Sequence, residues 1–129
     1  MNKFDLTYIV DDDAIFVSIF KKILSKIQNF SEIKHLKNGA IALSDLKKRF
    51  DNKQVFPDII FLDLNMPVLD GWQFLEELKQ LPFKNQLAIY VISSTIDKRE
   101  IKKCRKYKTV LNFIQKPTNE SQLKAILGI

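Results

Sequence analysis

Five short apolar runs recur along the chain, and a stretch with helical periodicity follows each of them. The runs comprise residues 6–10, 32–36, 59–62, 88–92 and 110–114. Apolar runs of this length are typical of strands that are buried on both faces of a sheet. The run at 32–36 is more polar than the others, so we expect it at an edge of the sheet.

The stretches after the runs predict five helices, at residues 14–28, 41–50, 72–80, 98–107 and 119–127. In the first helix an isoleucine recurs at every fourth position, and we expect this stripe to form the core face. The stripe consists of Ile15, Ile19, Ile23 and Ile27, with Phe16, Phe20 and Leu24 beside them. Phe50, in the second helix, is expected to point inward. Five alternations of strand and helix predict a doubly wound α/β fold, in which a parallel sheet carries helices on both faces.

Polar side chains follow four of the runs at the places where the predicted strands end. They are Asp11 and Asp12 after the first run, Asp63 after the third, Ser93 after the fourth and Lys116 after the fifth. The carboxyl ends of parallel strands lie at one edge of a sheet, where such folds bind their ligands. We therefore expect these five side chains to converge on a single pocket.

The residue types in this pocket favour phosphoryl chemistry. Three neighbouring carboxylates would raise one another's pKa, and Mg²⁺, which prefers carboxylate, water and phosphate oxygens, would relieve their repulsion. A bare metal site has no obvious use for a lysine and a hydroxyl. Lys116, however, can neutralise a phosphoryl group, and Ser93 can donate a hydrogen bond to it. Asp63 would then be a carboxylate nucleophile of the kind that forms acyl phosphates.

Four motifs in this order resemble those of the receiver domain of bacterial two-component response regulators. They are Val10-Asp11-Asp12, Asp63-x-Asn65-Met66-Pro67-x-x-Asp70-Gly71, Ser93 and Lys116-Pro117. The resemblance covers essentially the whole chain and is closest to stand-alone receivers of the chemotaxis-regulator kind. It implies a flavodoxin-like (βα)5 fold, with a five-stranded parallel sheet in the strand order 2-1-3-4-5.

The resemblance also implies a role for each acidic position. Asp63 would be the phosphoacceptor and, together with Asp12, a direct ligand of Mg²⁺. Asp11 would act on the metal through water, and the backbone carbonyl of Asn65 would complete the ligand set. Asp13 falls just after the usual acidic pair, so we interpret it as the N-cap of the first helix.

The remaining positions of the resemblance concern the switch. Ser93 matches the hydroxyl that moves to meet the phosphoryl oxygen, and Phe113 matches the aromatic switch position. Phe113 is also expected to contribute to the core, and the two interpretations are compatible. The resemblance implies that the bond between Lys116 and Pro117 is cis, and cis peptide bonds are found almost only before proline.

Length and composition are consistent with this interpretation. The 129 residues fit one domain, so we expect a single receiver domain over residues 1–129 with no output domain. The single cysteine, Cys104, excludes an internal disulfide and fits a reducing compartment. The amino terminus lacks the layout of a signal peptide, and no apolar run approaches the ~20 residues that span a membrane. We therefore expect a cytoplasmic protein that does not insert into membranes.

Seven basic residues cluster on or just after the predicted fourth helix of this chain, whose net charge is +6. They are Lys98, Arg99, Lys102, Lys103, Arg105, Lys106 and Lys108. Such a run is most simply a solvated face. In receivers, however, the face formed by the fourth helix, the fifth strand and the fifth helix commonly passes the signal on. A positive face there favours an acidic protein partner over nucleic acid, because no DNA-reading motif is present.

The hypothesis is therefore a phosphorylation-dependent signalling switch, not an enzyme that acts on other molecules. A histidine kinase or a phosphotransfer protein would donate the phosphoryl group, which would bias two pre-existing states. One alternative is a degenerate receiver used as a docking module. Another is a small phosphohydrolase of the haloacid dehalogenase type, which would need an acid where Asn65 stands. His35, on the predicted edge strand, is expected to lie far from the pocket.

Overall fold

A computed structural model describes residues 4–95 and 97–129 of the chain. Its strands are β1 (Phe4–Val10), β2 (Phe30–Leu36), β3 (Ile59–Asp63), β4 (Ile89–Ser93) and β5 (Val110–Gln115). Its helices are α1 (Ala14–Ile27), α2 (Gly39–Asp51), α3 (Gly71–Lys79), the 3₁₀ helix η1 (Lys84–Gln86), α4 (Lys98–Cys104) and α5 (Glu120–Leu127). The predicted alternation of strand and helix is confirmed.

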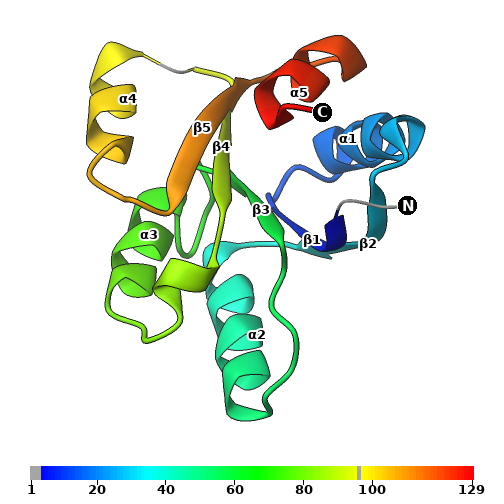
Figure 1. Cartoon of the computed structure of the whole chain (residues 1–129). Coiled ribbons are helices and arrows are strands. Elements are labelled where there is room, and N and C mark those ends of the chain that lie inside the picture. Colours follow the sequence, from blue (N-terminus) through cyan, green and yellow to red (C-terminus); the bar gives the residue numbers. More distant parts are fainter. Residues whose placement is uncertain (1–3, 96) are drawn as a thin grey trace.

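The strands form one parallel sheet in the order β2-β1-β3-β4-β5 (Figure 1), as the resemblance implies. The polar run at 32–36 is part of β2, which lies at an edge of the sheet as expected. The strand order reverses between β1 and β3, so the loops that leave these two neighbours diverge to opposite faces. In open α/β sheets, the carboxyl ends of two strands at such a reversal are where ligands bind.

Two apolar clusters cover the two faces of the sheet. Residues of α1 and α5 pack on one face, against Ile9 and Phe61 among others. Residues of α2, α3 and α4 pack on the other face, against Tyr8 and Leu62. Successive strand residues point to opposite faces, which is why neighbours in sequence such as Tyr8 and Ile9 belong to different clusters.

An acidic or amide side chain caps the amino terminus of each α-helix. The caps are Asp13, Asn38, Asp70, Asp97 and Asn119, and each accepts a hydrogen bond from a backbone N–H in the first turn. The interpretation of Asp13 as an N-cap is therefore confirmed. These caps fix where each helix begins, and thereby how each loop leaves the carboxyl edge of the sheet.

The predicted core face of α1 is wrong at Ile15 and Ile19 and confirmed at Phe20, Leu24 and Ile27. Ile15 and Ile19 are 76% and 54% exposed, whereas the buried residues are Val17, Phe20, Leu24 and Ile27. At 3.6 residues per turn, a step of four residues overshoots a full turn by about 40°, so a strict four-residue repeat winds off the core face. The buried set alternates steps of three and four and stays on one side of the helix.

Two further expectations differ from the structure. Phe50 is 44% exposed, and its ring lies at the surface against Phe83, with the ring centroids 5.2 Å apart. The fourth helix ends at Cys104, not at Tyr107. Turns follow it, in which Tyr107 N–H donates to the Cys104 carbonyl at 2.9 Å, and these turns carry the Tyr107 ring into the core. No helix in the described part of the chain has the length and apolar character needed to cross a bilayer.

Candidate functional site

The three predicted carboxylates meet at the carboxyl edge of the sheet. Asp11 and Asp12 follow β1 directly, and Asp63 is the last residue of β3, which pairs with β1. One carboxylate oxygen from each residue lies within 4.8 Å of the other two. Asp11 and Asp63 are buried, whereas Asp12 is exposed at the rim. The predicted convergence is thus present for the three carboxylates.

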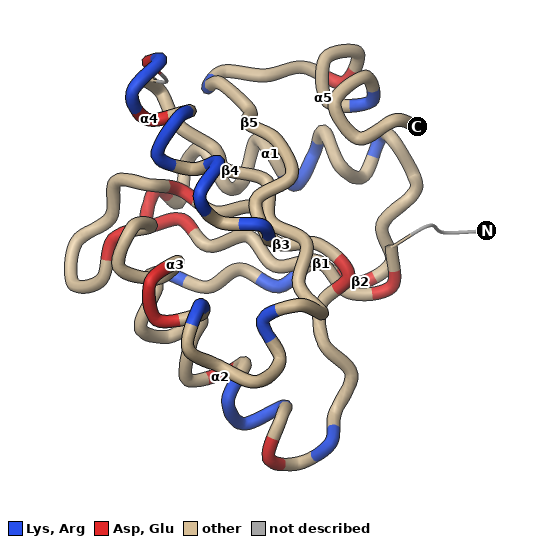
Figure 2. The backbone as a smooth tube through the Cα atoms, turned by 60° about the vertical axis from the view of Figure 1, so that its left-hand side comes forward, with Lys and Arg blue, Asp and Glu red and all other residues tan. Residues whose placement is uncertain are grey.

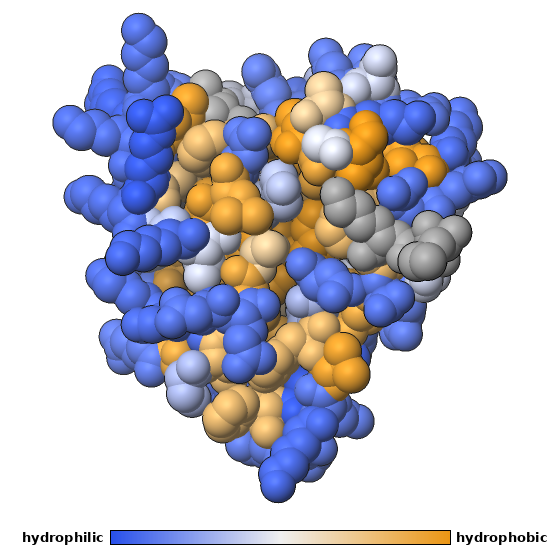
Figure 3. Space-filling view, viewed as in Figure 1, coloured by the Kyte–Doolittle hydropathy of each residue, from blue (hydrophilic) through white to orange (hydrophobic). Residues whose placement is uncertain are grey.

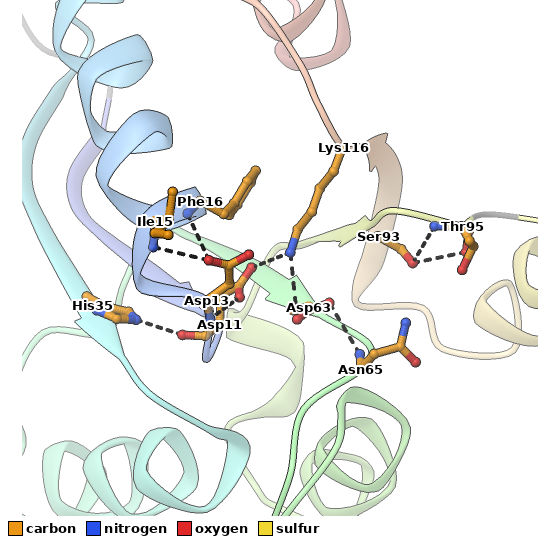
Figure 4. A network of polar contacts seen from close by, with 10 residues as sticks. All are labelled: Asp11, Asp13, Ile15, Phe16, His35, Asp63, Asn65, Ser93, Thr95 and Lys116. Atoms are coloured by element: carbon orange, nitrogen blue, oxygen red, sulfur yellow. Dashed lines mark hydrogen bonds and ion pairs between the residues drawn. The ribbon is translucent and has the colours of Figure 1, made fainter.

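Asp11 is held in place by the start of α1. Its Oδ1 accepts a hydrogen bond of 2.8 Å from the backbone N–H of Asp13. The Asp13 carboxylate is itself used by the helix, because it accepts the N–H groups of Ile15 and Phe16, each at 3.1 Å (Figure 4). Asp13 is therefore occupied as a cap, and the carboxylates that converge are those of Asp11, Asp12 and Asp63.

Lys116 brings the only ammonium group that is ion-paired to these carboxylates within the described residues. Its Nζ lies 2.9 Å from Asp11 Oδ2 and 3.8 Å from Asp63 Oδ2 (Figure 4). The pairing of β5 with β4 places Lys116 there, because Lys116 N–H donates to the Ser93 carbonyl at 2.9 Å where the two strands end side by side. The peptide bond to Pro117 is cis, as expected.

The charges in this pocket do not balance. Burial, followed by the negative charge of Asp11, raises the pKa of Asp63 to about 6. The Lys116 ammonium and the hydrogen bond from Asn65 N–H lower that pKa but do not offset the rise. Three carboxylates against one ammonium form an oxygen-rich, electron-rich donor set that fits a hard divalent cation. Asp11, Asp12 and Asp63 are the residues that could hold one.

Close packing fixes the loop that follows Asp63. Asn65 N–H donates to Asp63 Oδ1 at 3.2 Å, and Gly71 N–H donates to the Leu64 carbonyl at 3.0 Å. A Cβ atom on Gly71 would lie only 2.6 Å from the Asp63 carbonyl oxygen and 2.7 Å from Leu64 Cα. Only glycine therefore permits α3 to begin this close to the end of β3. The capping box between Asp70 and Gln73 then starts the helix.

Ser93 is fully buried, and its hydroxyl is turned toward Thr95. The hydroxyl donates to the Thr95 carbonyl at 3.0 Å and accepts the Thr95 N–H at 3.3 Å. In Figure 4 it lies beside Thr95 and not in contact with Lys116 or Asp63. Phe113, two residues before the end of β5, is half-buried against the cluster on the side of α2, α3 and α4.

Two residues near the carboxylates were not predicted. His35, expected far from the pocket, lies with Nε2 2.7 Å from the Asp11 carbonyl oxygen (Figure 4). The register of β2 on β1 carries it there, because Ile9 pairs with His35 and both side chains point to the α1 side. The Phe16 ring lies 4.2 Å below the Lys116 ammonium, a cation–π distance. The positions of the carboxylates could be predicted because each follows the end of a strand. No feature of the sequence indicates that His35 or Phe16 lies beside them.

Known proteins resemble this chain over most of its length. The model of the response regulator receiver domain matches residues 7–128. The chemotaxis protein CheY of Listeria monocytogenes is 31% identical over 112 residues, which are 87% of this chain and 87% of that protein. A crystal structure of a two-component response regulator from Cytophaga hutchinsonii superposes with a TM-score of 0.88 at 27% identity, covering 98% of this chain and 96% of that one.

A further relative is much longer than this chain. The protein-glutamate methylesterase/protein-glutamine glutaminase of Halalkalibacterium halodurans is 37% identical over 87 residues, which are 67% of this chain but 22% of that enzyme. The likeness is therefore confined to one part of the enzyme. Family match, strand order and the converging acidic residues agree, and the chain belongs to the receiver domains of two-component response regulators.

Proposed function

We propose that this chain is a phosphorylation-dependent switch whose phosphoacceptor is Asp63. The observation that carries the proposal is the setting of the Asp63 carboxylate, buried at the end of β3 between two other acids and the Lys116 ammonium. A histidine kinase or phosphotransfer protein is the donor. An Asp63 Oδ attacks phosphorus in line, the P–N bond of the phosphohistidine breaks, and the imidazole keeps the electron pair and takes up a proton from water.

Mg²⁺ would be held by Asp11, Asp12, Asp63 and the backbone carbonyl of Asn65. When bound, it neutralises charge on the phosphoryl oxygens and on the attacking carboxylate. Asp11 is well placed to hold a metal-bound water, since its carboxylate is fixed by Asp13 N–H and Lys116.

Lys116 and Ser93 recognise the phosphoryl group in this proposal. Lys116 already bridges Asp11 and Asp63, so a phosphoryl group on Asp63 would replace carboxylate contacts with stronger contacts to a more highly charged anion. Ser93 would release the Thr95 carbonyl and donate to a phosphoryl oxygen instead. That exchange breaks a backbone contact in the loop before α4, and Phe113 would follow Ser93 into the space that opens.

The switch would be read out by binding, through the face formed by α4, β5 and α5. Figure 2 shows that basic residues follow one another along α4 and the chain just after it. This positive surface favours an acidic protein as the downstream partner. The phosphohydrolase alternative has no comparable support, because position 65 holds an exposed asparagine where that chemistry needs an acid.

Intact-mass spectrometry after incubation with Mg²⁺ and acetyl phosphate tests the proposal. We expect one added phosphoryl group on the wild-type chain, and none without Mg²⁺ or in Asp63→Asn. Asp13→Asn is the matched control, since asparagine is as good an N-cap and the carboxylate it removes belongs to the helix. This variant should be phosphorylated normally.

A second measurement covers the case of a short-lived phosphate. Beryllofluoride mimics the phosphoryl group without being hydrolysed, and its binding with Mg²⁺ should shift the amide resonances of Ser93 and Thr95. A wild-type chain that neither gains mass nor responds to beryllofluoride would overturn the phosphoswitch and favour a docking module.

A further inference from the structure

A second charged site lies at the opposite edge of the sheet from Asp63. A hollow of about 370 Å³ opens between the end of α3, η1 and the segment that joins α4 to β5. Four lysines line it: Lys79, Lys84, Lys106 and Lys108. We call it the lysine hollow. It lies at the amino ends of β4 and β5, whereas the carboxylates lie at the carboxyl ends of the strands.

The floor of the lysine hollow is apolar. Leu78 and the Tyr107 ring line it, and both belong to the core on this side of the sheet. Figure 3 shows mainly hydrophilic side chains on the left, over α4 and α3, with small hydrophobic patches between them. A ligand seated here would therefore meet hydrocarbon below and positive charge around it.

The four lysines of the hollow lack acidic partners among the residues that the structure describes. Within the described residues none of them forms an ion pair, whereas Lys34, Lys116 and Lys124 each do. Lys84 Nζ donates to the backbone carbonyl of Lys79 at 2.9 Å, and Lys79 Nζ lies 6.0 Å from the centroid of the Tyr107 ring. The nearby acid Glu76 is already engaged, because it accepts the Tyr107 hydroxyl at 2.5 Å.

Four like charges around one concave space repel each other, and an anion in that space would remove the repulsion. Lys79, Lys106 and Lys108 are exposed and Lys84 is half-buried, and η1 and the chain after α4 hold their backbones around a shared hollow. Its volume lies within the roughly 300–1,000 Å³ typical of small-molecule sites. Phosphate groups suit the charge, and the apolar floor suits a ring system beside them.

We propose that the lysine hollow binds a small organic polyphosphate, of the class of nucleoside triphosphates. Its phosphates contact the lysine ammonium groups, and its ring packs over Leu78 and Tyr107. The site shares no residue with the carboxylate pocket, so binding needs neither Mg²⁺ nor phosphorylation of Asp63. Tyr107 also lines a cleft between α3 and α4 with Trp72 and Lys103. A ligand bound in the lysine hollow therefore contacts the segment that joins α4 to β5.

The test is a titration of ¹⁵N-labelled protein with ATP, with EDTA present to exclude metal and at physiological ionic strength. We expect saturable shifts in the amide resonances of Lys84, Asn85, Lys106 and Thr109, and none at Asp11 or Asp63. Pyrophosphate should shift the same resonances with weaker affinity, because it carries the charge without the ring. Shifts that never saturate, or that spread equally over α1, would overturn the proposal.

Matched variants separate a built site from general attraction of anions to a basic protein. Lys84→Gln with Lys108→Gln removes two charges from the hollow, and Lys22→Gln with Lys26→Gln removes two exposed charges from α1. The first pair should weaken ATP binding by about tenfold or more, and the second should change it by less than about twofold. Equal weakening by both pairs would contradict the proposal. The spectra report the fold of each variant, and the two single variants replace the pair if it is unfolded.

Discussion

Val68, in the loop after Asp63, has a backbone conformation that its side chain disfavours. Its φ is 72°, and the residue is 80% exposed, so no packing of its side chain compensates. The flanking N–H of Leu69 donates to the Pro67 carbonyl at 2.9 Å, which closes a tight turn around Val68. A β-branched residue at positive φ is strained, whereas glycine adopts this region without penalty.

We expect Val68→Gly to raise the free energy of unfolding by about 0.5–1 kcal/mol, as relief of the strain exceeds the entropy that glycine adds to the unfolded chain. Urea denaturation measures the change. Val55→Gly is the control, because Val55 is 72% exposed and is not among the residues with positive φ. Val55→Gly should lower the free energy of unfolding by about 0.5–1 kcal/mol, because glycine adds entropy to the unfolded chain. A similar decrease in Val68→Gly would show that the turn is not strained.

His35 supports the carboxylates without contacting them. A carbonyl oxygen can only accept a hydrogen bond, so Nε2 of His35 carries the proton that it donates to the Asp11 carbonyl. Removing this donor frees the backbone that positions Asp11 and Asp12. We expect His35→Ala to weaken Mg²⁺ binding roughly tenfold, as the loss of supporting hydrogen bonds does in other metal sites.

Isothermal titration calorimetry with Mg²⁺ provides the measurement for His35. Ile33→Ala, also half-buried on β2, is the comparison, because it removes apolar contact from the same strand without touching Asp11. If both variants bind Mg²⁺ as tightly as the wild type does, the hydrogen bond from His35 has no part in shaping the pocket.

The carboxylates were predictable from the sequence, whereas their supports were not. A parallel strand that ends on an acid places that acid at a known edge of the sheet, whatever the details of packing. The contacts of His35 and Phe16 depend instead on the register of β2 on β1 and on the rotation of α1. The pattern of apolar and polar residues along the sequence determines neither this register nor this rotation.

Within α1, some apolar residues are buried and stabilise the core, whereas others are exposed and do not. Leu24 is fully buried, and Ile19 is 54% exposed, although both belong to one apolar helix. Leu24→Ala should lower the free energy of unfolding by about 2–5 kcal/mol, because it leaves a cavity in the core. Ile19→Ala should change it by less than about 0.5 kcal/mol, as surface substitutions usually do.

Chemical denaturation of the two α1 variants checks this assignment. A large loss in Ile19→Ala would mean that the four-residue stripe does face the core in solution. The prediction failed at Ile15 and Ile19 because α1 carries apolar residues on more than one side, so its sequence pattern fits more than one core face. The helix starts were more reliable, since Asp13 and Asp70 mark them through hydrogen bonds that are local in sequence.

In the overall architecture, the parallel sheet was the most predictable feature. Its strands are short apolar runs separated by helices, a combination that few other folds accommodate. The strand order came from the resemblance to receivers and is confirmed. The lysine hollow was not predicted, because its lysines come from three segments that are brought together only by the packing of α3, η1 and the chain after α4.

Asp45 links three elements on the far side of the sheet from α1. It accepts hydrogen bonds from the Tyr8 hydroxyl of β1, from Lys34 Nζ of β2 at 2.8 Å, and from Arg49 Nε of α2 at 3.1 Å. Burial by itself would raise the pKa of Asp45, but these hydrogen bonds outweigh burial and hold the pKa below its ordinary value. The charged carboxylate therefore stabilises the folded state.

The stabilisation by Asp45 should depend on pH. A carboxyl whose folded-state pKa is lowered contributes its full stability above the unfolded-state pKa and loses that contribution as the pH falls through the folded-state pKa. We expect Asp45→Asn to lower the free energy of unfolding by about 2 kcal/mol at pH 7, because Tyr8, Lys34 and Arg49 lose a charged acceptor. Urea denaturation of both chains from pH 7 downward should show the difference closing once the pH falls below the ordinary carboxyl pKa of about 4. A difference that stays constant down to acid pH would mean that the carboxylate charge is not what ties β1, β2 and α2 together.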